Sequence, residues 1–212
     1  MRSATRRLER IVFPEARSAG DQWQRVVMDE SIGDYIESLD PASRSAVEIS
    51  GDSHADWPWR SYTNLNFPQF DLCAPLGDHG KFDVVICEQV LEHVVDPWTA
   101  AANLRGLAAP GGHVIVSTPF LIKVHEIALF LMDDYWRFTP RGLRLILEHA
   151  GLKVDIVASW GNAACVVGNF RRWSGYRRWH ALDNDPDLAV QVWAFARNLD
   201  RSEAAQAASP GS

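Results

Sequence analysis

The sequence predicts an α/β fold built on a largely parallel sheet, and three consecutive elements in the middle of the chain carry that prediction. Residues 82–87 form an apolar run broken by a single Asp, as in a strand buried on both faces of a parallel sheet. Residues 96–107 begin with Asp-Pro, the residue types of an N-cap and a first helical position. A Pro-Gly-Gly turn then leads to an apolar strand at residues 113–118. These elements make a β-α-β unit, for which a right-handed crossover is expected.

A helical region and two strands precede this unit. Residues 21–39 place apolar side chains at the spacing of one or two amphipathic helices. We expect residues 1–40 to form a helical arm or a lid, although a helix that only packs on the sheet explains the pattern equally well. Residues 45–50 and 61–66 have the composition of short strands, and they open a main domain that we place at residues 41–200.

The elements that follow the unit continue the alternation of helices and strands. A short amphipathic helix is expected at about residues 124–132. A Thr-Pro pair caps and opens a further helix at residues 139–149, and a Gly follows its end. The last two strands are expected at residues 153–160 and 188–196. Residues 201–212 consist largely of Ala, Ser, Gly and Pro and are expected to be a disordered tail.

Length, charge and cysteine content narrow the class of protein. A chain of 212 residues is long enough for one domain with a large core. The formal net charge of −6 argues against a surface built to bind nucleic acid. Three cysteines without CxxC spacing indicate reduced thiols in a cytoplasmic protein. No apolar run is long enough to cross a bilayer, and the basic N-terminus lacks the apolar core of a signal peptide.

Two sets of polar residues follow the two central strands. Four of them come directly after the first of these strands: Glu88, Gln89, Glu92 and His93. His125 and Glu126 follow the second strand. Ligands bind at the carboxyl ends of the strands in open α/β sheets, so the sequence predicts a site at this edge.

An ordered set of short motifs gives the chain a family resemblance. FDVV is followed by E-x-x-x-EH, DPW, PGG and a strand that ends in STP. At this spacing the set resembles the middle of a class I S-adenosylmethionine (SAM)-dependent methyltransferase of the small-metabolite type, and a weaker resemblance extends over residues 46–197. The resemblance implies a single Rossmann-like domain with a seven-stranded, mostly parallel sheet. Its order would be 3-2-1-4-5-7-6, with strand 7 antiparallel and helices on both faces.

The resemblance also implies SAM as the cofactor and assigns a first group of residues to it. Glu48 matches the acid that opens the family's first motif, and Gly51 is the one glycine in the turn that follows. Ser50 stands where another glycine is usual, and its small side chain keeps the turn feasible. Asn66 takes the place of the carboxylate that binds the ribose hydroxyls, so it can hydrogen-bond but lacks the charge.

A second group of cofactor residues follows from the same resemblance. Asp71 matches the adenine contact, whose carboxylate accepts from the exocyclic amine while the N–H of Leu72 donates to the ring. Asp71 lies twelve residues before Asp83, which is about the family's spacing. Glu88 and Gln89, at the end of the next strand, are expected to flank the cofactor.

Three residues are candidates for acid–base chemistry. His125 is the first choice of general base, because it lies near the ligand edge and an imidazole titrates near neutral pH. His93 and Glu126 come next. Structural roles explain the histidines about as well, since buried polar groups are usually paired for structural reasons. The resemblance adds three residues that either line the acceptor pocket or anchor its segment to the sheet: Tyr135, Trp136 and Arg137.

Glu92, His93 and His125 are also of the types that hold a divalent metal, and they suit Mn²⁺ or Zn²⁺ better than Mg²⁺. Members of the family that methylate RNA 3′ ends hold a metal with two Glu and two His. In this sequence Glu88 lies four residues before Glu92 instead of three, and Gln89 occupies the matching position. The metal is therefore the less favoured hypothesis.

The resemblance implies a methyltransferase, and we expect transfer to a hydroxyl group of a small molecule. Nine Trp and four Tyr favour a sugar or oligosaccharide slightly, because aromatic rings stack on sugar faces. The alternatives are a natural-product O- or N-methyltransferase, a metal-dependent RNA-end methyltransferase, and a non-catalytic scaffold that kept the fold. The expected partner is a small hydroxylated molecule rather than nucleic acid, and a homodimer is left open.

Overall fold

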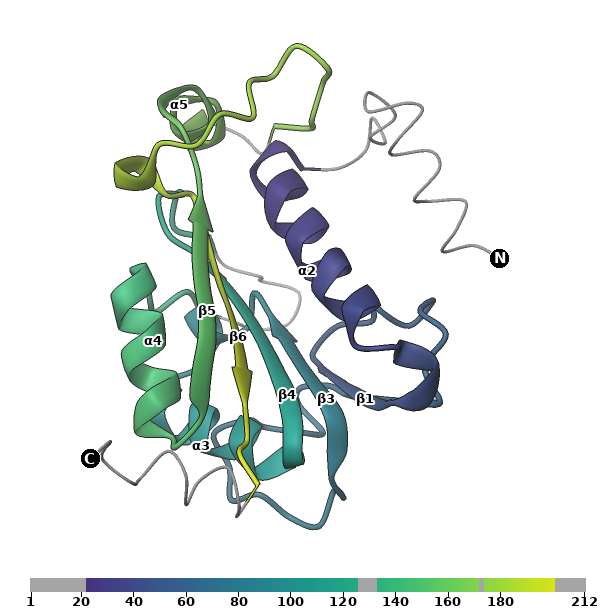
Figure 1. The fold of residues 1–212 in the computed structure, drawn as a ribbon. Coiled ribbons are helices and arrows are strands. Elements are labelled where there is room, and N and C mark those ends of the chain that lie inside the picture. The colour runs from purple at the N-terminus through teal and green to yellow at the C-terminus, as the bar shows by residue number, and fades with distance from the viewer. Residues whose placement is uncertain (1–21, 126–132, 172–173, 201–212) are drawn as a thin grey trace, which may run out of the picture.

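The computed structural model describes residues 22–125, 133–171 and 174–200, which build a six-stranded sheet between two layers of helices (Figure 1). The strand order is β2-β1-β3-β4-β6-β5. Neighbours from β2 to β4 run parallel, whereas β6 is antiparallel to both β4 and β5. The strands are β1 (Ser45–Ile49), β2 (Ser61–Leu65), β3 (Phe82–Glu88), β4 (Ala108–Pro119), β5 (Lys153–Trp160) and β6 (Gln191–Arg197). The predicted α/β class is confirmed.

The described residues form six strands instead of the expected seven, because the third strand of the expected order does not form. The segment between β2 and β3 contains Pro68 and Pro75, and proline has no N–H to donate to a sheet ladder. A turn stands there instead, in which the Ala74 N–H donates to the Asp71 carbonyl at 3.0 Å. The expected count of seven strands was therefore wrong. The other six strands have the expected order.

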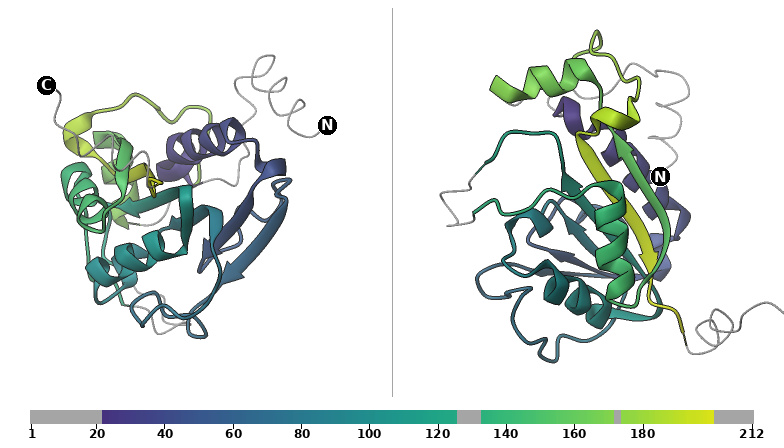
Figure 2. Two further views of the ribbon diagram at one scale, coloured as in Figure 1. Left: turned by 60° about the horizontal axis from the view of Figure 1, so that its bottom comes forward. Right: turned by 90° about the vertical axis from the view of Figure 1, so that its left-hand side faces the viewer.

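Helices cover both faces of the sheet (Figures 1 and 2). On one face, α3 (Pro97–Leu107) and α4 (Pro140–His149) pack over β3, β4 and β6 in a core that includes Leu104 and Leu147. On the other face, α2 (Val26–Ser38) buries Met28, Ile32 and Ile36 against the sheet. The helix at the start of the chain is therefore a structural layer of the domain.

The caps that the sequence predicts for α3 and α4 are both made. Asp96 accepts hydrogen bonds from the backbone N–H groups of Trp98 and Thr99, at 3.1 Å each. Thr139 accepts from the Gly142 N–H at 3.1 Å. Because these caps fix where each helix begins, they also fix the loops that precede the helices at the ligand edge.

Shorter helical elements complete the described chain. These are η1 (Trp23–Arg25), η2 (Pro41–Ser43), η3 (Leu91–His93), α5 (Ala163–Arg171) and η5 (Pro186–Leu188). Most of the helix expected at residues 124–132 lies outside the described residues. In the part of the chain that the structure describes, no helix combines the length and apolar character needed to span a membrane.

Candidate active site

The loop after β1 is shaped by a buried carboxylate. Glu48 accepts hydrogen bonds from the backbone N–H groups of Ser53 and His54, at 3.1 and 3.0 Å, and from the Tyr62 hydroxyl at 2.6 Å. A Cβ at Gly51 would lie 2.9 Å from a Glu48 oxygen, so this position has no room for a side chain. Ser50 adopts a φ of 52°, a left-handed conformation in which glycine is usual. Glu48 and Gly51 thus build the predicted turn, with Glu48 acting on the loop itself.

Glu88, at the end of β3, belongs to a second group of polar residues. Its carboxylate accepts from Arg25 Nη2 at 2.6 Å and lies 2.5 Å from His54 Nε2. We call Arg25, His54 and Glu88 the Glu88 cluster. Burial opposes ionisation of Glu88, but the hydrogen bond and charge of His54 and the charge of Arg25 hold its pKa below the usual value. The same pair, also against burial, raises the pKa of His54.

Two residues of the Glu88 cluster, Arg25 and His54, were not among the site residues expected from the sequence. Arg25 stands at the start of an amphipathic helical pattern, 63 residues before its partner, and His54 lies 34 residues before it. No local pattern marks such a pairing. Gln89, which was expected beside the cofactor, has a φ of 55°. Its amide donates to Ser117 Oγ at 3.1 Å and to Gln191 Oε1 at 3.0 Å.

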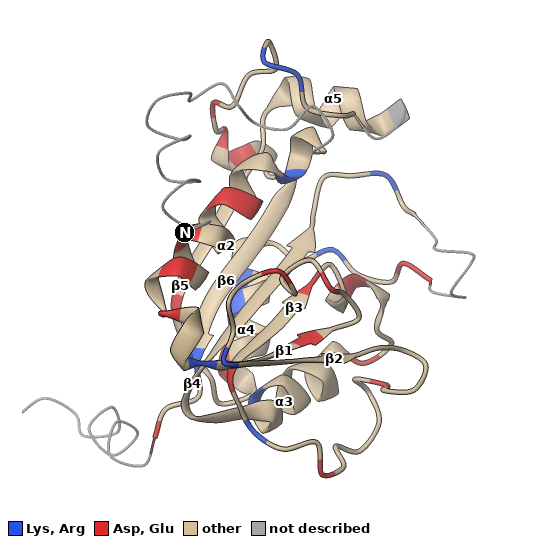
Figure 3. Cartoon of the chain, turned by 90° about the vertical axis from the view of Figure 1, so that its right-hand side faces the viewer, with Lys and Arg blue, Asp and Glu red and all other residues tan. Residues whose placement is uncertain are grey.

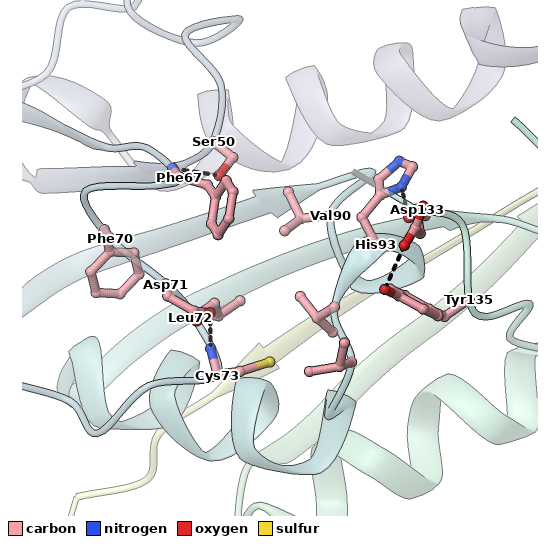
Figure 4. Close-up of a pocket in the computed structure, with 12 residues that line it drawn as sticks. Ser50, Phe67, Phe70, Asp71, Leu72, Cys73, Val90, His93, Asp133 and Tyr135 are labelled. Carbon is pink, nitrogen blue, oxygen red and sulfur yellow. Dashed lines mark hydrogen bonds between the residues drawn. The ribbon is translucent and has the colours of Figure 1, made fainter. Parts of the chain in front are cut away.

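A cavity of about 250 Å³ opens at the carboxyl edge of the sheet (Figure 4). It runs from the loop after β1, at Ser50, past Asp71 and Leu72, to the turn that carries His93. Tyr135 lines the end near His93. Residues expected at the cofactor and residues expected at the acceptor therefore line one continuous cavity.

The adenine-side residues are held by their own turn. Asp71 accepts from the Cys73 N–H at 2.8 Å, and the Asn103 amide donates to the carbonyls of Leu72 and Ala74 at 2.8 Å each. Asn66 is exposed, and its amide contacts the Asn64 side chain. Asp71 and Leu72 line the cavity, whereas Asn66 is not among the residues that do.

The turn after β3 holds a carboxylate with no exposed surface. Neither oxygen of Glu92 has a hydrogen-bond partner among the described residues, and Oε1 lies 3.7 Å from His93 Nε2. Burial, helped by the charge of Asp134, raises the pKa of Glu92 to about 8. Glu92 is thus a buried acid for which the loss of solvation outweighs the more distant charges of Arg137 and Arg25.

Two imidazoles stand beside this carboxylate. His93 Nδ1 lies 2.7 Å from the Asp133 carbonyl, and His125 Nδ1 lies 3.0 Å from Asp134 Oδ2. The two rings meet edge to face with centroids 5.1 Å apart. Burial lowers the pKa of His125, against the opposing charge of Asp134. We call Glu92, His93, His125 and Asp134 the Glu92 cluster.

Asp134 also fixes the segment that carries the expected acceptor residues. Its buried carboxylate accepts from the His125 N–H at 2.8 Å and forms an ion pair with Arg137. The backbone N–H groups of Tyr135 and Trp136 donate to the Glu92 carbonyl at 2.7 and 3.2 Å, and the Trp136 indole donates to the Val94 carbonyl at 2.8 Å. Trp136 and Arg137 therefore anchor the segment, whereas Tyr135 reaches the cavity. Glu126 lies outside the described residues.

Chemically, the Glu92 cluster can do two things. An imidazole oriented by a carboxylate can accept a proton, as His125 beside Asp134 is placed to do. A carboxylate with two imidazoles can also hold a cation. Of this cluster, His93 is among the residues that line the cavity, whereas Glu92, His125 and Asp134 are not.

Comparisons with known proteins place this geometry in a family. A family model described as a methyltransferase domain matches residues 19–156, more than half of the chain. The chain is 31% identical over 112 residues to a ubiquinone biosynthesis O-methyltransferase of Cronobacter sakazakii, covering 49% of this chain and 46% of that protein. It is 42% identical over 64 residues to the protein of the same name from Methylococcus capsulatus, covering 30% of this chain and 27% of that protein. The chain thus spans less than half the length of these curated relatives.

A solved structure shares the fold. The crystal structure of a SAM-dependent methyltransferase from Mesorhizobium loti superposes with a TM-score of 0.51 at 12% identity. The match covers 77% of this chain and 96% of that chain. At this identity the likeness concerns the fold alone.

Proposed function

This chain belongs to the class I SAM-dependent methyltransferases, and we propose that it transfers the methyl group of SAM to a hydroxyl group of a small molecule. The continuous cavity carries the proposal, because it joins the Asp71–Leu72 turn to His93 of the Glu92 cluster. A cofactor whose adenine lies at that turn would point its reactive end along the cavity toward His93. The names of the relatives, which are O-methyltransferases, favour oxygen as the acceptor atom.

The transfer is an in-line displacement in which SAM supplies an electrophilic methyl group on a sulfonium. The acceptor oxygen must be held about 3 Å from that methyl, a geometry worth roughly 7–11 kcal/mol of the barrier. As the oxygen–carbon bond forms, the sulfur–carbon bond breaks and its electron pair returns to sulfur. We assign the Glu92 cluster to the acceptor hydroxyl. In the simplest form of the proposal, His125 takes the hydroxyl proton while Asp134 holds its ring.

The acceptor class is a finer proposal. Tyr135 and Phe67, both partly exposed, give the cavity aromatic walls that suit either a sugar ring or a phenol. The aromatic content of the sequence leans toward a sugar, whereas the names of the relatives place those proteins in ubiquinone biosynthesis. A natural-product hydroxyl or amine is the remaining small-molecule alternative.

The test is methyl transfer from radiolabelled SAM to a panel of sugars, simple phenols, catechols and primary amines. We expect product with at least one hydroxylated group and none with the amines. Transfer only to amines would contradict the choice of oxygen. Calorimetry with SAM runs beside it, since a well-folded protein that does not bind SAM would favour the non-catalytic scaffold instead.

An RNA end is the least favoured acceptor. Lys and Arg are scattered over several elements in the view of Figure 3, while Asp and Glu line α2 and several loops. The formal net charge of −6 adds a general repulsion of polyanions. Binding of a short RNA at moderate salt would argue for this alternative.

A further inference from the structure

We propose that Glu92, His93 and His125 form a divalent-cation site of one carboxylate and two imidazoles, which binds the acceptor hydroxyl in the cavity. The cation site itself is argued from the contacts of these residues. Its role toward the acceptor rests on the proposed function.

The three side chains converge at the right scale. One ligand atom of each lies within 4.8 Å of those of the other two. Imidazole nitrogens and carboxylate oxygens bind Zn²⁺ at roughly 2.0–2.2 Å, so that two ligands of one cation are about 3–4 Å apart. One carboxylate with two imidazoles suits Zn²⁺, Mn²⁺, Fe²⁺ or Co²⁺ better than Mg²⁺.

Glu92 supplies independent evidence that a charged partner belongs here. The residue has no exposed surface, and neither carboxylate oxygen accepts a hydrogen bond from a described residue. A buried polar group without a partner costs roughly 1–3 kcal/mol, and a charged one costs more. A cation in contact with these oxygens would offset that cost, and it would act on the ionised form of the acid.

His93 has the outer contact of a metal ligand, and His125 lies in ion-pair contact with a carboxylate. A ligating histidine usually donates its second ring N–H to a carbonyl or a carboxylate, which fixes the ring and its tautomer. His93 Nδ1 has such a partner in the Asp133 carbonyl, at 2.7 Å, which leaves Nε2 on the side of Glu92. His125 Nδ1 lies 3.0 Å from the Asp134 carboxylate. Asp134 in turn forms an ion pair with Arg137.

Neighbouring candidates for a further ligand are engaged elsewhere. The Glu88 carboxylate contacts Arg25 and His54, and the Gln89 amide donates to Ser117 and Gln191. Among the three proposed ligands Glu92 is the single carboxylate, and the neighbouring Asp134 is paired with Arg137, so a bound dication would keep a net positive charge. Coordination positions left by the three ligands can take the acceptor oxygen. The cation would lower the pKa of that hydroxyl, whose proton leaves to water, so that His125 acts as a ligand and not as a base.

The decisive experiment measures cation binding directly, on the full chain freed of metal by a chelator. Titration with MnCl₂ followed by electron paramagnetic resonance, and with ZnCl₂ followed by calorimetry, should show one site per chain. Glu92→Gln and His93→Gln should each weaken that site by at least about tenfold. The matched control is His149→Gln, which removes an exposed imidazole on α4 and should leave binding unchanged. Circular dichroism establishes that each variant is folded.

Two results would overturn the cation site. One is a wild-type chain with no stoichiometric Mn²⁺ or Zn²⁺ binding, and the other is a folded Glu92→Gln variant that binds as the wild type does. The role toward the acceptor is tested separately, by methyl transfer in the chelated protein. Full activity of the chelated protein would refute a role of the cation in catalysis. His125 would then be the proposed base, and the proposed function would be unaffected. Loss of SAM binding in calorimetry would refute the proposed function and leave the cation titration to stand on its own.

Discussion

Glu88 and Glu92 lie four residues apart on the same edge of the sheet, and their surroundings are opposite. Glu88 contacts a guanidinium and an imidazole, which keep its pKa below the usual value. Glu92 has no hydrogen-bond partner among the described residues, and burial raises its pKa to about 8. The difference separates two uses of a buried carboxylate. A paired one holds elements of the fold together, and an unpaired one is available to a ligand.

The largest expected effect concerns the Glu92 cluster. His125→Ala should lower turnover by about 10²–10⁴-fold, because it removes either the base or a cation ligand. SAM affinity should stay within about twofold, since the residue is placed on the acceptor side. Single-turnover methyl transfer and calorimetry measure the two quantities. Unchanged turnover would remove His125 from the site.

The next largest effect is a loss of stability when the Glu88 cluster loses its carboxylate. Glu88→Gln leaves Arg25 and His54 partly buried without their common counter-charge, and removing one partner of a buried ion pair costs roughly 3–5 kcal/mol. The observed loss should be at or below that range, because the Arg25 side chain is 26% exposed and is partly screened. Urea unfolding measures it. The control is Asp29→Asn, which removes the partly exposed ion pair between Arg25 and Asp29 of α2 and should cost less than about 1 kcal/mol.

Replacing Glu92 should stabilise the folded protein, whereas replacing Glu88 should destabilise it. Its pKa in the folded protein, about 8, is above that of an unfolded glutamate. The folded state therefore binds more protons over the range between about 4.5 and 8, and stability is lost as the pH rises through that range. In chelator, Glu92→Gln should raise the melting temperature at pH 8 and flatten its dependence on pH. A variant that is less stable than the wild type at pH 8 would mean that Glu92 has a structural partner.

The smallest effect tests the far end of the cavity. Asp71→Asn keeps the acceptor for the Cys73 N–H and weakens the acceptor proposed for adenine, so SAM should bind about three- to tenfold more weakly. Asp78→Asn changes an exposed Asp of the same segment, which caps its own turn toward Gly80. It should leave SAM affinity unchanged. Equal effects of the two changes would point to the loop and not to a specific contact.

The sequence predicted the elements of this fold where local chemistry decides them. The apolar run of β3, the Asp96 cap and the Thr139 cap each depend on residues a few positions apart, and all three are present. The third strand expected from the family resemblance does not form, because two prolines interrupt its segment. The prediction followed the family pattern and gave these prolines too little weight. Local rules thus gave most of the architecture.

The site was predictable only in part. That the residues after β3 would meet His125 follows from parallel strands ending at one edge, and the structure places these side chains together. The environment of Glu88 did not follow, because its partners Arg25 and His54 lie 63 and 34 residues away in the sequence. The orientation of Gln89 depends on its left-handed backbone conformation, which the residue type does not predict.

Glu92 also connects the two imidazoles to one wall of the cavity, through its side chain and its backbone. Its side chain faces the imidazoles, and its carbonyl accepts from the N–H of Tyr135, whose ring lines the wall. That hydrogen bond is 2.7 Å long and joins the two backbones. A substitution that shifts the backbone at Glu92 should therefore also change the wall that Tyr135 gives the cavity.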